Sequence, residues 1–304
     1  MSIICRPAEP EDIPKAIAIR AIASEDVRER YGFGAKRKEE VFTPDSFYAF
    51  SVKHEPEGFW VAEDGDRIVG MVITWLRGSF WFLSYLFVAP EYQDREVGKH
   101  LIDTAMRVEG SRKISNRALI TYAYNVASLG LYMKCDMFSR EPVYKMAGAI
   151  SSIHSKITTN LMDEAVRLEN NLGTLRALSV IDRRLLGFAR QRHHKFLLQR
   201  RDGSGYLFRN GKDVLGYSYI WDDGQIGPLA ALSDNSFTDV FEASLALASA
   251  KETEQLSILV PGSNASAITI ALKYRLRIRE PYILMSTKPF GKWNQYLFHS
   301  PPLL

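Results

Sequence analysis

The chain has 304 residues, of which 46% are hydrophobic and 24% are charged, a length that favours two domains with separate cores. Lys and Arg number 39 and Asp and Glu number 35, so the formal net charge is only +4. No dense basic run is present, and we therefore expect no nucleic-acid partner. The sequence does not indicate an oligomeric state.

The sequence also bears on targeting and on the redox compartment. No apolar run is long enough to cross a membrane, and the first residues lack the apolar core of a secretion signal. Cys5 and Cys135 lie far apart and have no His or Cys neighbours at ligand spacing. We therefore expect no disulfide framework and no metal site, in a reduced, cytoplasmic protein that does not enter a membrane.

The first predicted elements are a short strand over residues 2–8 and a helix over residues 9–27. Along this helix Ile13, Ile17 and Ala21 share one face. Carboxylates gather at its start, where they complement the positive end of the helix dipole.

A second helix and three apolar strands are predicted next. They are a helix over 42–54, a hairpin over 58–76 and a strand over 79–88. The helix is expected to begin at Thr43 and Pro44, because Pro suits the first helical turn. Asp64 and Gly65 supply the positive φ angles of a tight hairpin turn. The third strand is apolar almost throughout, which indicates burial on both faces.

The first half then continues with a helix, a strand and a further helix. Their expected ranges are 96–108, 117–125 and 128–135. Strands and helices mixed in this order predict a layered domain of the α/β (α+β) class.

The connection "VAPEYQDREVGKHL" (88–101) leads from a predicted strand into a predicted helix. The first N–H groups of such a helix, with the helix dipole, can bind a phosphate if the side chains of the turn allow it. Phosphate-binding turns favour Gly for this reason, but only Gly98 is present here. Taken alone, the pattern is more typical of an ordinary structural connection.

Two segments together resemble the GNAT superfamily of N-acyltransferases. The first resembles the motif Val-x-Pro followed by Gln/Arg-x-x-Gly-x-Gly/Ala, and the second resembles Asn-x-x-Ala/Ser-x-x-Leu-Tyr. The matching residues are Val88, Pro90, Gln93 and Gly98 in the first segment, and Asn125, Ser128, Leu131, Tyr132 and Phe138 in the second. Glu96 stands where the first motif Gly is expected.

The resemblance implies acetyl-CoA as co-substrate and a small-molecule or peptide amine as acceptor, with no metal. It implies these cofactor contacts: Leu86, Phe87 and Val88 on the pantetheine arm, Gln93, Asp94, Arg95, Glu96, Val97, Gly98 and Lys99 around the pyrophosphate, and Asn125 and Ser128 on the other side of the arm. Tyr132 would stand beside the sulfur as catalytic acid, since a phenol and a thiol have similar acidities.

Two residues depart from the motif. Glu96 brings a negative charge to a place for anionic oxygens, unless its side chain points away along the helix surface, as a first-turn Glu favours. Lys99 and Arg95 can offset this charge. Asp94 also stands where Gly is common, with little consequence if its φ is negative.

Among the site residues, the one that accepts the proton of the amine is the least well defined by the sequence. Glu25 and Asp26 lie near the end of the first helix, where GNAT substrates commonly enter. Glu63 is another candidate, but as a turn residue it is expected mainly to be solvated. Tyr85 or Ser84 on the apolar strand could instead pass a proton through water.

The second half repeats the first. Residues 205–232 echo the strands of 58–88. Further on, Asn264, Ala267 and Ile270 match Asn125, Ser128 and Leu131, but Ala271 stands in the place of Tyr132, and no phosphate turn follows the third strand. We therefore predict two tandem GNAT-like domains, each a mixed, mostly antiparallel sheet flanked by helices. Their limits are 1–148 for the catalytic domain, 149–200 for a helical connection and 201–304 for a degenerate copy.

A basic segment over 180–198 precedes the second domain. We interpret it as a solvated helix face, with Arg183, Arg184, Arg190 and Arg192 outside and Leu186 and Phe196 inside, or alternatively as a wall of the acceptor site. His193 and His194 are adjacent and point about 100° apart on a helix, so they are not a pair of metal ligands.

Three functions remain open at this stage. The chain could be a catalytic acyl-CoA-dependent N-acyltransferase, a non-catalytic acyl-CoA-binding pseudoenzyme, or a partner-binding protein that keeps only the fold. Glu96 makes the second of these more credible than the motif alone would.

Overall fold

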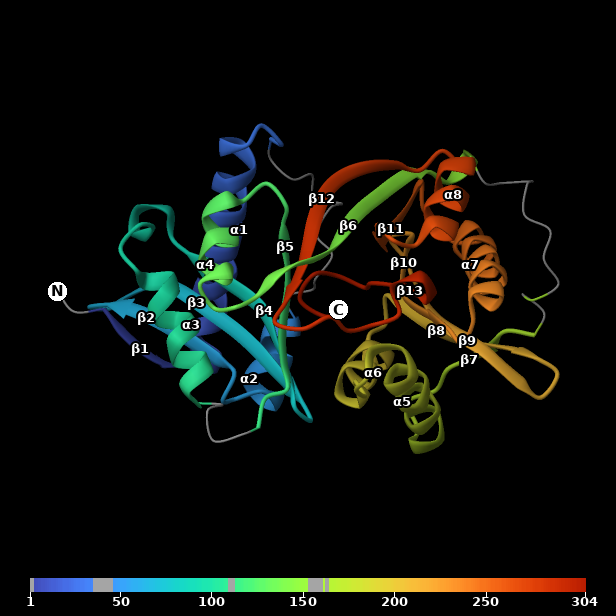
Figure 1. Cartoon of the computed structure of the whole chain (residues 1–304), viewed down its shortest axis with the longest axis horizontal. Helices are drawn as coiled ribbons and strands as arrows, with labels where there is room; N and C mark the ends of the chain where they lie inside the picture. Colours follow the sequence, from blue (N-terminus) through green and yellow to red (C-terminus); the bar gives the residue numbers. More distant parts are fainter. Residues whose placement is uncertain (1–2, 35–45, 109–112, 153–160, 162–163) are drawn as a thin grey trace. The chain divides into compact units, whose positions relative to one another are not determined.

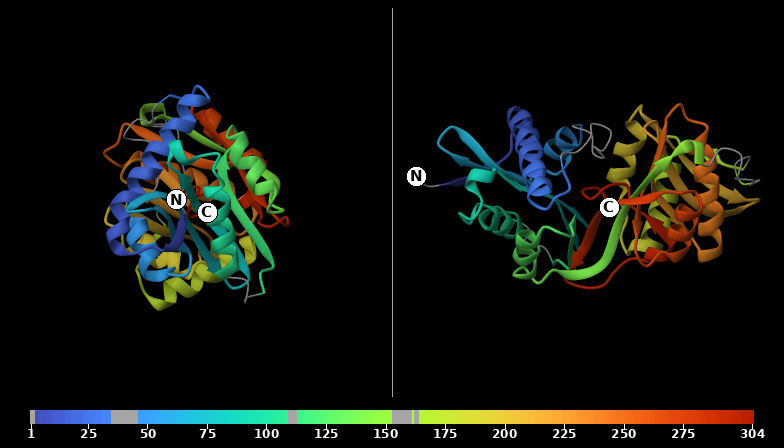
Figure 2. Two further views of the ribbon diagram at one scale, coloured as in Figure 1. Left: turned by 90° about the vertical axis from the view of Figure 1, so that its left-hand side faces the viewer. Right: turned by 90° about the horizontal axis from the view of Figure 1, so that it is seen from above.

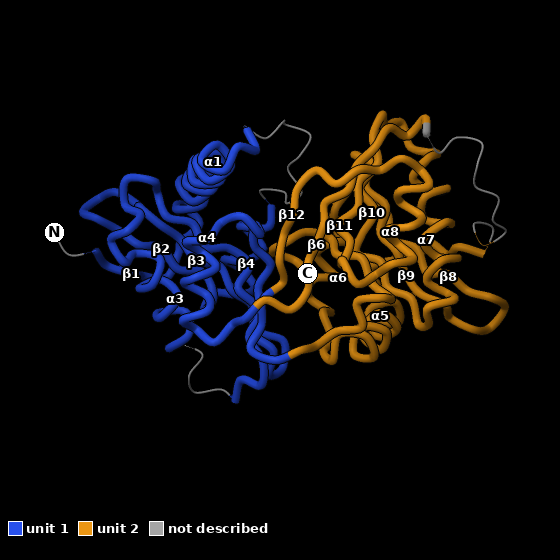
Figure 3. The backbone as a smooth tube through the Cα atoms, turned by 45° about the horizontal axis from the view of Figure 1, so that its top comes forward, with its two compact units in different colours: residues 1–138, 285–288 blue, residues 139–284, 289–304 orange. Residues whose placement is uncertain are grey.

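The computed structural model describes residues 3–34, 46–108, 113–152, 161 and 164–304. The chain forms two compact units (Figure 3). Unit 1 comprises Met1–Phe138 and Met285–Lys288, and unit 2 comprises Ser139–Leu284 and Pro289–Leu304. Each unit has a mostly antiparallel sheet with helices on it, and the domain limits expected at 148 and 200 stay a prediction.

The sheet of unit 1 has the strand order β1-β2-β3-β4-β5 (Figure 1). Its strands are β1 (Ile4–Pro7), β2 (Phe59–Asp64), β3 (Arg67–Arg77), β4 (Phe80–Val88) and β5 (Asn116–Tyr122). Strands β1 to β4 pair antiparallel, whereas β5 pairs parallel with β4. Gly65 has a φ of 60° in the turn between β2 and β3, as predicted, whereas Asp64, for which a positive φ was also predicted, is the last residue of β2 and does not have one.

Helices cover both faces of this sheet. They are α1 (Ile13–Arg30), α2 (Ser46–His54), α3 (Val97–Val108) and α4 (Val126–Met133). Helices α1 and α3 both pack on β3, from opposite faces (Figure 2). The predicted start of the second helix at Thr43 and Pro44 lies outside the described residues.

The buried face of α1 differs from the predicted one. Ala16, Ile19 and Ala23 are buried, whereas Ala21 is exposed. This face packs on β3 and β4, and its small side chains allow the helix to approach the sheet closely.

The carboxylates before α1 are held by Arg6. Asp12 accepts a hydrogen bond from Arg6 at 2.6 Å and another from the backbone N–H of Glu9 at 2.9 Å. The hydrogen bond from Arg6 lowers the pKa of Asp12. Arg6 also donates to Glu63 at 2.6 Å, so this candidate for the proton acceptor takes part in a structural ion pair.

Unit 2 contains a longer sheet. Its strands are β6 (Phe138–Ala149), β7 (Val166–Arg167), β8 (Gly203–Asn210), β9 (Asp213–Trp221), β10 (Gln225–Ala231), β11 (Gln255–Pro261), β12 (Arg277–Ser286) and β13 (Tyr296–Leu297). Its helices are α5 (Leu172–Leu186), α6 (Gln191–Gln199), α7 (Asp234–Ser249) and α8 (Ala265–Lys273). Apolar residues of α7 and α8 pack with β9, β10 and β11 into its core. In the described parts of the chain, no helix is both long enough and apolar enough to span a membrane.

The two units repeat local geometry. The hairpins β2–β3 and β8–β9 each have a register shift near the turn, after Ala62 and after Phe208. Asp136 after α4 and Arg275 after α8 both have positive φ, 60° and 63°, at the same distance from the N-caps of their helices, Asn125 and Asn264. The repeat predicted from sequence therefore extends to individual backbone angles.

Residues 285–288, which follow almost all of unit 2, complete the sheet edge of unit 1. The backbone N–H of Thr287 donates to the carbonyl oxygen of Arg117 in β5 at 2.9 Å. Asn116 accepts from the Thr287 hydroxyl at 2.8 Å and from the backbone N–H of Lys288 at 3.0 Å. Unit 1 is thus assembled from two distant parts of the chain.

The basic segment of unit 2 corrects one prediction. It forms two helices, because α5 ends at Gly187 with a φ of 89° and α6 begins at Gln191. Arg183 and Arg192 are exposed as predicted, but Arg190 is only 1% exposed. Helical periodicity does not continue through the break, so the predicted orientation of Arg190 was wrong.

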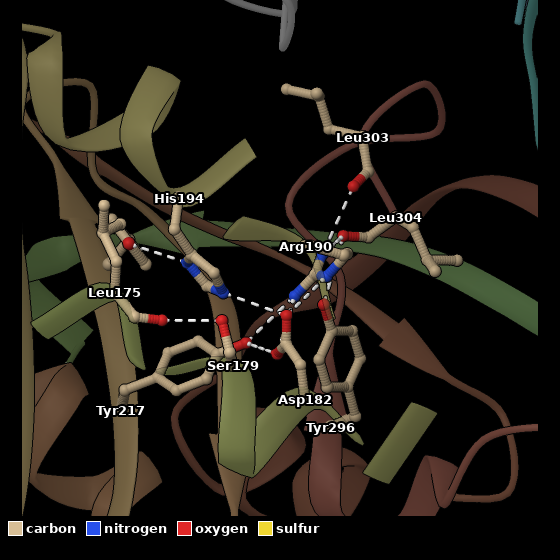
Figure 4. Close-up of polar contacts among 10 residues, drawn as sticks. Leu175, Ser179, Asp182, Arg190, His194, Tyr217, Tyr296, Leu303 and Leu304 are labelled. Atoms are coloured by element: carbon tan, nitrogen blue, oxygen red, sulfur yellow. Dashed lines mark hydrogen bonds and ion pairs between the residues drawn. The ribbon is translucent and has the colours of Figure 1, made fainter. Parts of the chain in front are cut away.

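Arg190 belongs to a buried polar network within unit 2 (Figure 4). Its Nε donates to Asp182 at 3.0 Å, and Tyr217 donates to the other carboxylate oxygen at 2.6 Å. The ring of His194 contacts Asp182 through Nε2 at 3.0 Å and Tyr219 through Nδ1 at 2.9 Å. Burial lowers the pKa of His194, so the neutral ring donates to Asp182 and accepts from Tyr219.

Candidate functional site

Strands β4 and β5 separate partway along their length. Their parallel register runs from Phe80 opposite Asn116 to Leu83 opposite Leu119. Within the described residues it stops there, although β4 continues to Val88 and β5 to Tyr122. A register shift between β3 and β4 at the same level bends the strand. Beyond Leu83 the edge of β4 that faces β5 therefore has no strand partner in the described residues, and its backbone groups can pair with an extended ligand; we call this position the slot.

The turn after β4 leads directly to the start of α3. Gln93 ties the turn to the strand, since its Nε2 donates to the carbonyl oxygen of Val88 at 3.2 Å. Asp94 and Glu96 have φ angles of 60° and 59°, the left-handed region that favours glycine. From its sequence, Asp94 is expected to have little consequence for phosphate binding if its φ is negative, but its φ is positive. The backbone of this turn therefore has the conformation of a glycine-containing turn, although Asp94 and Glu96 stand at the positions that favour glycine.

The N-terminus of α3 presents donors to this slot. His100 is the first residue whose N–H bonds back toward the turn, to the carbonyl oxygen of Glu96 at 2.9 Å. The N–H groups of Val97, Gly98 and Lys99 belong to the first turn and have no partner inside the helix. With the positive end of the helix dipole, they form a group of donors suited to an anion.

Charged side chains around the turn point outward. The side chain of Glu96 is 69% exposed, and its carboxylate lies 3.9 Å from Nζ of Lys99. The guanidinium of Arg95 lies over the ring of Tyr92, 5.0 Å from its centre. The carboxylate of Glu96 thus lies in solvent, where the charge of Lys99 partly balances it. The backbone of Glu96 can therefore still face a bound anion.

Gly98 stands where β4, α3 and α4 meet. A Cβ atom at this position would lie 3.6 Å from Leu131, 3.7 Å from Val88 and 3.8 Å from Leu86, all ordinary contact distances. The structure therefore brings together residues from both predicted motifs and from the separated end of β4. Leu86, Phe87 and Val88 are half-buried there.

The start of α4 holds the residues of the second motif. Asn125 caps the helix, and its side chain accepts from the backbone N–H of Ser128 at 3.3 Å. The Nδ2 of Asn125 donates to Oγ of Ser128 at 2.8 Å. Tyr132 is 5% exposed. Burial raises the pKa of the Tyr132 phenol, and the side chains of Ser128 and Thr121 oppose the rise.

Two other predicted residues lie apart from this group. Tyr85 is 8% exposed and packs among rings, with centroids 5.7 Å from Tyr48 and 5.5 Å from Phe87. Glu25 is exposed on α1, and its neighbour Asp26 forms an ion pair with Arg30 at 2.5 Å. Of these, only Glu25 presents a carboxylate to solvent without entering the core.

Arg30 is a residue that the motifs did not indicate. Its Nη2 lies 3.2 Å from Oε1 of Gln93, so this cation from the end of α1 borders the turn before α3. No sequence spacing connects the two residues, since the contact depends on how α1 crosses the sheet.

An aromatic group borders the same end of the sheet. Tyr122 and Tyr124 at the end of β5 stack at 5.0 Å, and Phe33 stacks on Tyr124 at 4.1 Å. Oγ of Ser24 lies 3.1 Å from Oη of Tyr122. Arg28 donates to the carbonyl oxygen of Phe33 at 3.2 Å and so fixes the residues after α1. This group lies directly before Asn125 in the chain.

The equivalent slot in unit 2 is filled by the chain itself. Strands β10 and β11 pair in parallel only through Gln225 and Ile226. Beyond them β13 pairs with β10, Leu297 opposite Leu229, and Phe298 bridges to Leu259 in β11. A peptide segment thus pairs in unit 2 at the position where, in the described residues of unit 1, β4 has no strand partner.

The helix after β10 also lacks an open anion site. Only Leu232 and Ser233 separate β10 from α7, and Ser233 caps that helix by accepting from the N–H of Ser236 at 3.1 Å. Asn294 donates to Asp234 in the first turn at 2.7 Å. The start of α7 is therefore covered by side chains of its own unit.

Comparison with known proteins extends these observations. Residues 19–137 match the sequence model of the acetyltransferase (GNAT) family. A candidate acetyltransferase from Pyrococcus horikoshii is similar in structure with a TM-score of 0.73 and 18% identity, over 98% of this chain and 95% of that one. A tandem GNAT protein from the clavulanic acid biosynthesis pathway gives 0.64 and 12% identity, over 95% and 99%.

A GCN5-related N-acetyltransferase from Sphaerobacter thermophilus gives a TM-score of 0.62 and 11% identity, over 96% of this chain and 98% of that one. No curated protein matches the sequence. At these identities the likeness concerns the fold, and it extends over both units. The predicted tandem arrangement of mixed, mostly antiparallel sheets is confirmed.

Proposed function

We propose, from the match of residues 19–137 to the acetyltransferase (GNAT) family model, that unit 1 transfers an acetyl group from acetyl-CoA to a primary amine. One observation carries this proposal: the edge of β4 beyond Leu83 is open directly beside the donors at the start of α3. An extended, amide-bearing chain that ends in phosphates matches this pairing of an open strand edge with an anion site.

Unit 2 provides an analogy for how the pantetheine arm would fit beside β4 in unit 1. There the equivalent slot holds the peptide of β13, and Nδ2 of Asn264 donates to the carbonyl oxygens of Trp293 at 3.2 Å and Tyr296 at 3.4 Å. Pantetheine also carries amide groups along an extended chain. By analogy Leu86, Phe87 and Val88 would hold it by their backbone, with Asn125 and Ser128 on the other side.

The pyrophosphate would lie against the turn from Gln93 to Lys99. The N–H groups of Val97, Gly98 and Lys99 supply the donors, while Asp94 and Glu96 supply only their backbone. Arg30, Arg95 and Lys99 place positive charge around the turn. The exposed carboxylate of Glu96 reduces this charge, and affinity is therefore expected to be modest.

The chemistry needs few groups. When bound, acetyl-CoA supplies the thioester whose carbonyl carbon the neutral amine attacks; a C–N bond forms and the C–S bond breaks. Tyr132 gives its phenolic proton to the leaving sulfur, the nitrogen loses a proton to water or to Glu25, and water restores the phenol. Holding amine and thioester together contributes several kcal/mol, on the order of 7–11 in well-oriented cases. An acid of this kind typically contributes about 10²-fold or more.

The acceptor amine would reach the slot beside the aromatic group of Phe33, Tyr122 and Tyr124. The half-buried rings of Tyr122 and Tyr124, with the exposed ring of Phe33, favour an amine that carries an apolar or aromatic group. Glu25, exposed on the same helix as Ser24, is the carboxylate best able to receive a proton there.

Unit 2 would be a non-catalytic copy that stabilises the protein. Ala267 and Ala271 replace Ser128 and Tyr132, and β13 fills the slot. With both the acid and the binding space lost, unit 2 has no place for a second acetyl-CoA.

Calorimetric titration of the full chain with acetyl-CoA tests binding, and release of free thiol with a panel of primary amines tests transfer. We expect one binding site per chain and turnover that falls about 10²-fold in Tyr132→Phe. Binding without turnover for any amine would favour a pseudoenzyme. Absence of binding would leave a partner-binding protein with a GNAT fold.

A further inference from the structure

Positive charge is concentrated in the two helices α5 and α6 of unit 2. Residues 172–201, which include both helices, contain eight of the 39 basic residues and one of the 35 acidic residues of the chain. This segment therefore has a formal charge of +7, whereas the whole chain has +4 and the remaining residues together have −3. Its single acid, Asp182, is 0% exposed and binds the buried Arg190. Within this fully described segment, no side-chain carboxylate reaches solvent.

The exposed side of α5 carries these charges in one stripe, which we call the α5 surface. It consists of Leu172, Arg176, Val180, Arg183 and Arg184. At about 100° per residue, these five positions fall within an arc of roughly 120° on the helix. Leu172 is 68% exposed and Val180 is 63% exposed. Arginines and aliphatic side chains are therefore interleaved on a single helix face that is open to solvent.

The cations of this surface have no role inside the fold. In the part of the chain that the structure describes, the side chains of Arg176, Arg183, Arg184 and Lys195 form no hydrogen bond or ion pair. Lys195 lies on α6, which packs beside α5 (Figure 1). Arg200, by contrast, is bonded to a neighbouring carboxylate. Because charges of one sign on adjacent helices repel one another, a negatively charged partner would stabilise this side of unit 2.

We propose that the α5 surface binds an acidic, amphipathic helix of a partner protein. The carboxylates of that helix would meet Arg176, Arg183 and Arg184, since a guanidinium holds a carboxylate by two parallel N–H···O hydrogen bonds. Its apolar side chains would cover Leu172 and Val180, which removes their aliphatic area from water. This interaction is additional to the proposed acyl transfer and does not depend on it.

A nucleic acid fits the same surface less well. Phosphates would satisfy the arginines, but they offer no apolar contact to Leu172 or Val180. Single-stranded nucleic acids bind through aromatic side chains on which the bases stack. The two Phe residues of the segment, Phe188 and Phe196, are only 8% and 7% exposed. The interleaved aliphatic side chains therefore favour a protein partner.

An anionic membrane also fits less well. A helix that lies in a membrane interface buries its whole apolar face among the lipids. The apolar face of α5 is turned into unit 2, where Leu178, Ile181 and Leu185 are 0%, 3% and 2% exposed. Only Leu172 and Val180 remain for lipid, which is too little apolar area to hold the protein at a bilayer.

Fluorescence anisotropy with the full chain tests the proposal. The probes are a labelled amphipathic helical peptide of Leu, Ala and Glu, and the same peptide with every Glu replaced by Gln. We expect the Glu peptide to bind with an affinity that falls as the salt concentration rises. The Gln peptide should bind about tenfold more weakly. Equal affinity for the two peptides, or no binding of the Glu peptide at low salt, overturns the proposal.

Variants locate the binding on the α5 surface. The pair Arg176→Glu and Arg183→Glu should weaken binding of the Glu peptide about tenfold or more. The control pair Arg209→Glu and Arg279→Glu makes the same change of net charge at exposed positions of β8 and β12 and should alter Kd by less than about twofold. An equal loss in both pairs would mean that only net charge matters and would overturn the proposed site.

The apolar part of the surface is tested by Val180→Ser. This variant should weaken binding of the Glu peptide about threefold and leave binding of labelled poly-L-glutamate unchanged, because poly-L-glutamate has no apolar side chains to cover Val180. An unchanged Kd for the Glu peptide would contradict the amphipathic character of the partner. Thermal unfolding checks that each variant is folded.

Competing probes decide the class of partner. Duplex DNA and vesicles of phosphatidylglycerol should each bind more weakly than the Glu peptide at the same ionic strength, and tighter binding of either overturns the assignment to a protein. Calorimetric titration with acetyl-CoA should give the same Kd in all these variants. The result for the α5 surface and the result for the proposed acyl transfer can therefore fail independently.

Discussion

Asn125 and Asn264 occupy the same backbone position in the two units, with φ and ψ of −80° and 79° in one and −81° and 77° in the other. Both side chains cap a helix, but Nδ2 of Asn125 reaches a hydroxyl and Nδ2 of Asn264 reaches backbone carbonyl oxygens. The shared cap maintains the fold of each copy. The two units differ in the group that accepts a hydrogen bond from this side-chain amide. It is a hydroxyl in unit 1, and it is backbone carbonyl oxygens in unit 2, where β13 fills the slot.

Replacing Glu96 by Gly should both stabilise unit 1 and strengthen acetyl-CoA binding. A left-handed residue other than Gly costs about 1–2 kcal/mol, of which the greater freedom of Gly in the unfolded chain cancels part. We expect a gain of about 0.5–1 kcal/mol in unfolding free energy. Removing a negative charge beside the phosphate donors should lower Kd several-fold. Denaturant unfolding and calorimetric titration measure the two effects.

Asp136→Gly is the matched control for this change. Asp136 has the same positive φ, 60°, but follows α4 rather than the turn before α3. It should gain similar stability with Kd unchanged. If both variants changed Kd equally, the effect would stem from backbone strain and not from the charge of Glu96.

Arg30 should contribute to acetyl-CoA binding through charge alone. Its side chain is 48% exposed and borders Gln93, so Arg30→Gln is expected to raise Kd about threefold at low salt and less at high salt. Arg183→Gln, an exposed change on α5, should leave Kd unchanged at every salt concentration. A salt-independent loss in Arg30→Gln would speak against a purely electrostatic role.

The stability of unit 2 should fall as the pH drops from about 7.5 to 5.5. Burial lowers the pKa of His194, and burial with the positive charges of Arg200 and Arg190 lowers the pKa of His299. Below the ordinary histidine pKa of about 6.5 the unfolded chain therefore binds protons that the folded chain does not. Each such histidine costs up to about 1.4 kcal/mol per pH unit.

Thermal unfolding across this pH range checks the sign and the origin of the effect. His299→Asn should flatten the dependence, whereas His100→Asn, at an exposed position of α3, should keep it. Stability that rose on acidification would mean that the buried rings are charged in the folded protein.

Loss of the Asp182 carboxylate should destabilise unit 2 strongly. Asp182→Ala leaves Arg190, 1% exposed, without its anion, and breaking such a buried pair costs about 3–5 kcal/mol. Asp202→Ala removes an exposed partner of Arg200 and should cost less than about 1 kcal/mol. Denaturant titration of the two variants compares them directly, and similar losses would contradict the importance of burial.

Local chemistry made much of this protein predictable. The Asp64-Gly65 turn, the apolar strand before the phosphate turn and the match of Asn264 to Asn125 follow from short-range patterns that the structure retains. Tyr132 was predicted as the acid from the resemblance of its segment to the family motif, and the structure places it on the short helix that Asn125 caps.

Features that depend on distant partners were not predictable in the same way. Arg190 stands in a basic run that is typical of a solvated surface, yet Gly187 breaks the helix and Asp182 binds the guanidinium in the core. Arg30 meets Gln93 only because α1 crosses the sheet. The positive φ of Asp94 is a property of the turn as a whole, which a single residue type does not reveal.

The return of residues 285–288 to unit 1 has a consequence for biosynthesis. The hydrogen bond between Arg117 and Thr287 joins positions 170 apart in the chain, so it forms only after most of unit 2 has left the ribosome. Until then β5 presents an uncovered edge, a typical starting point for aggregation. The domain that translation delivers first is therefore among the last to be completed, and a chaperone that shields this edge would raise the yield of folded protein.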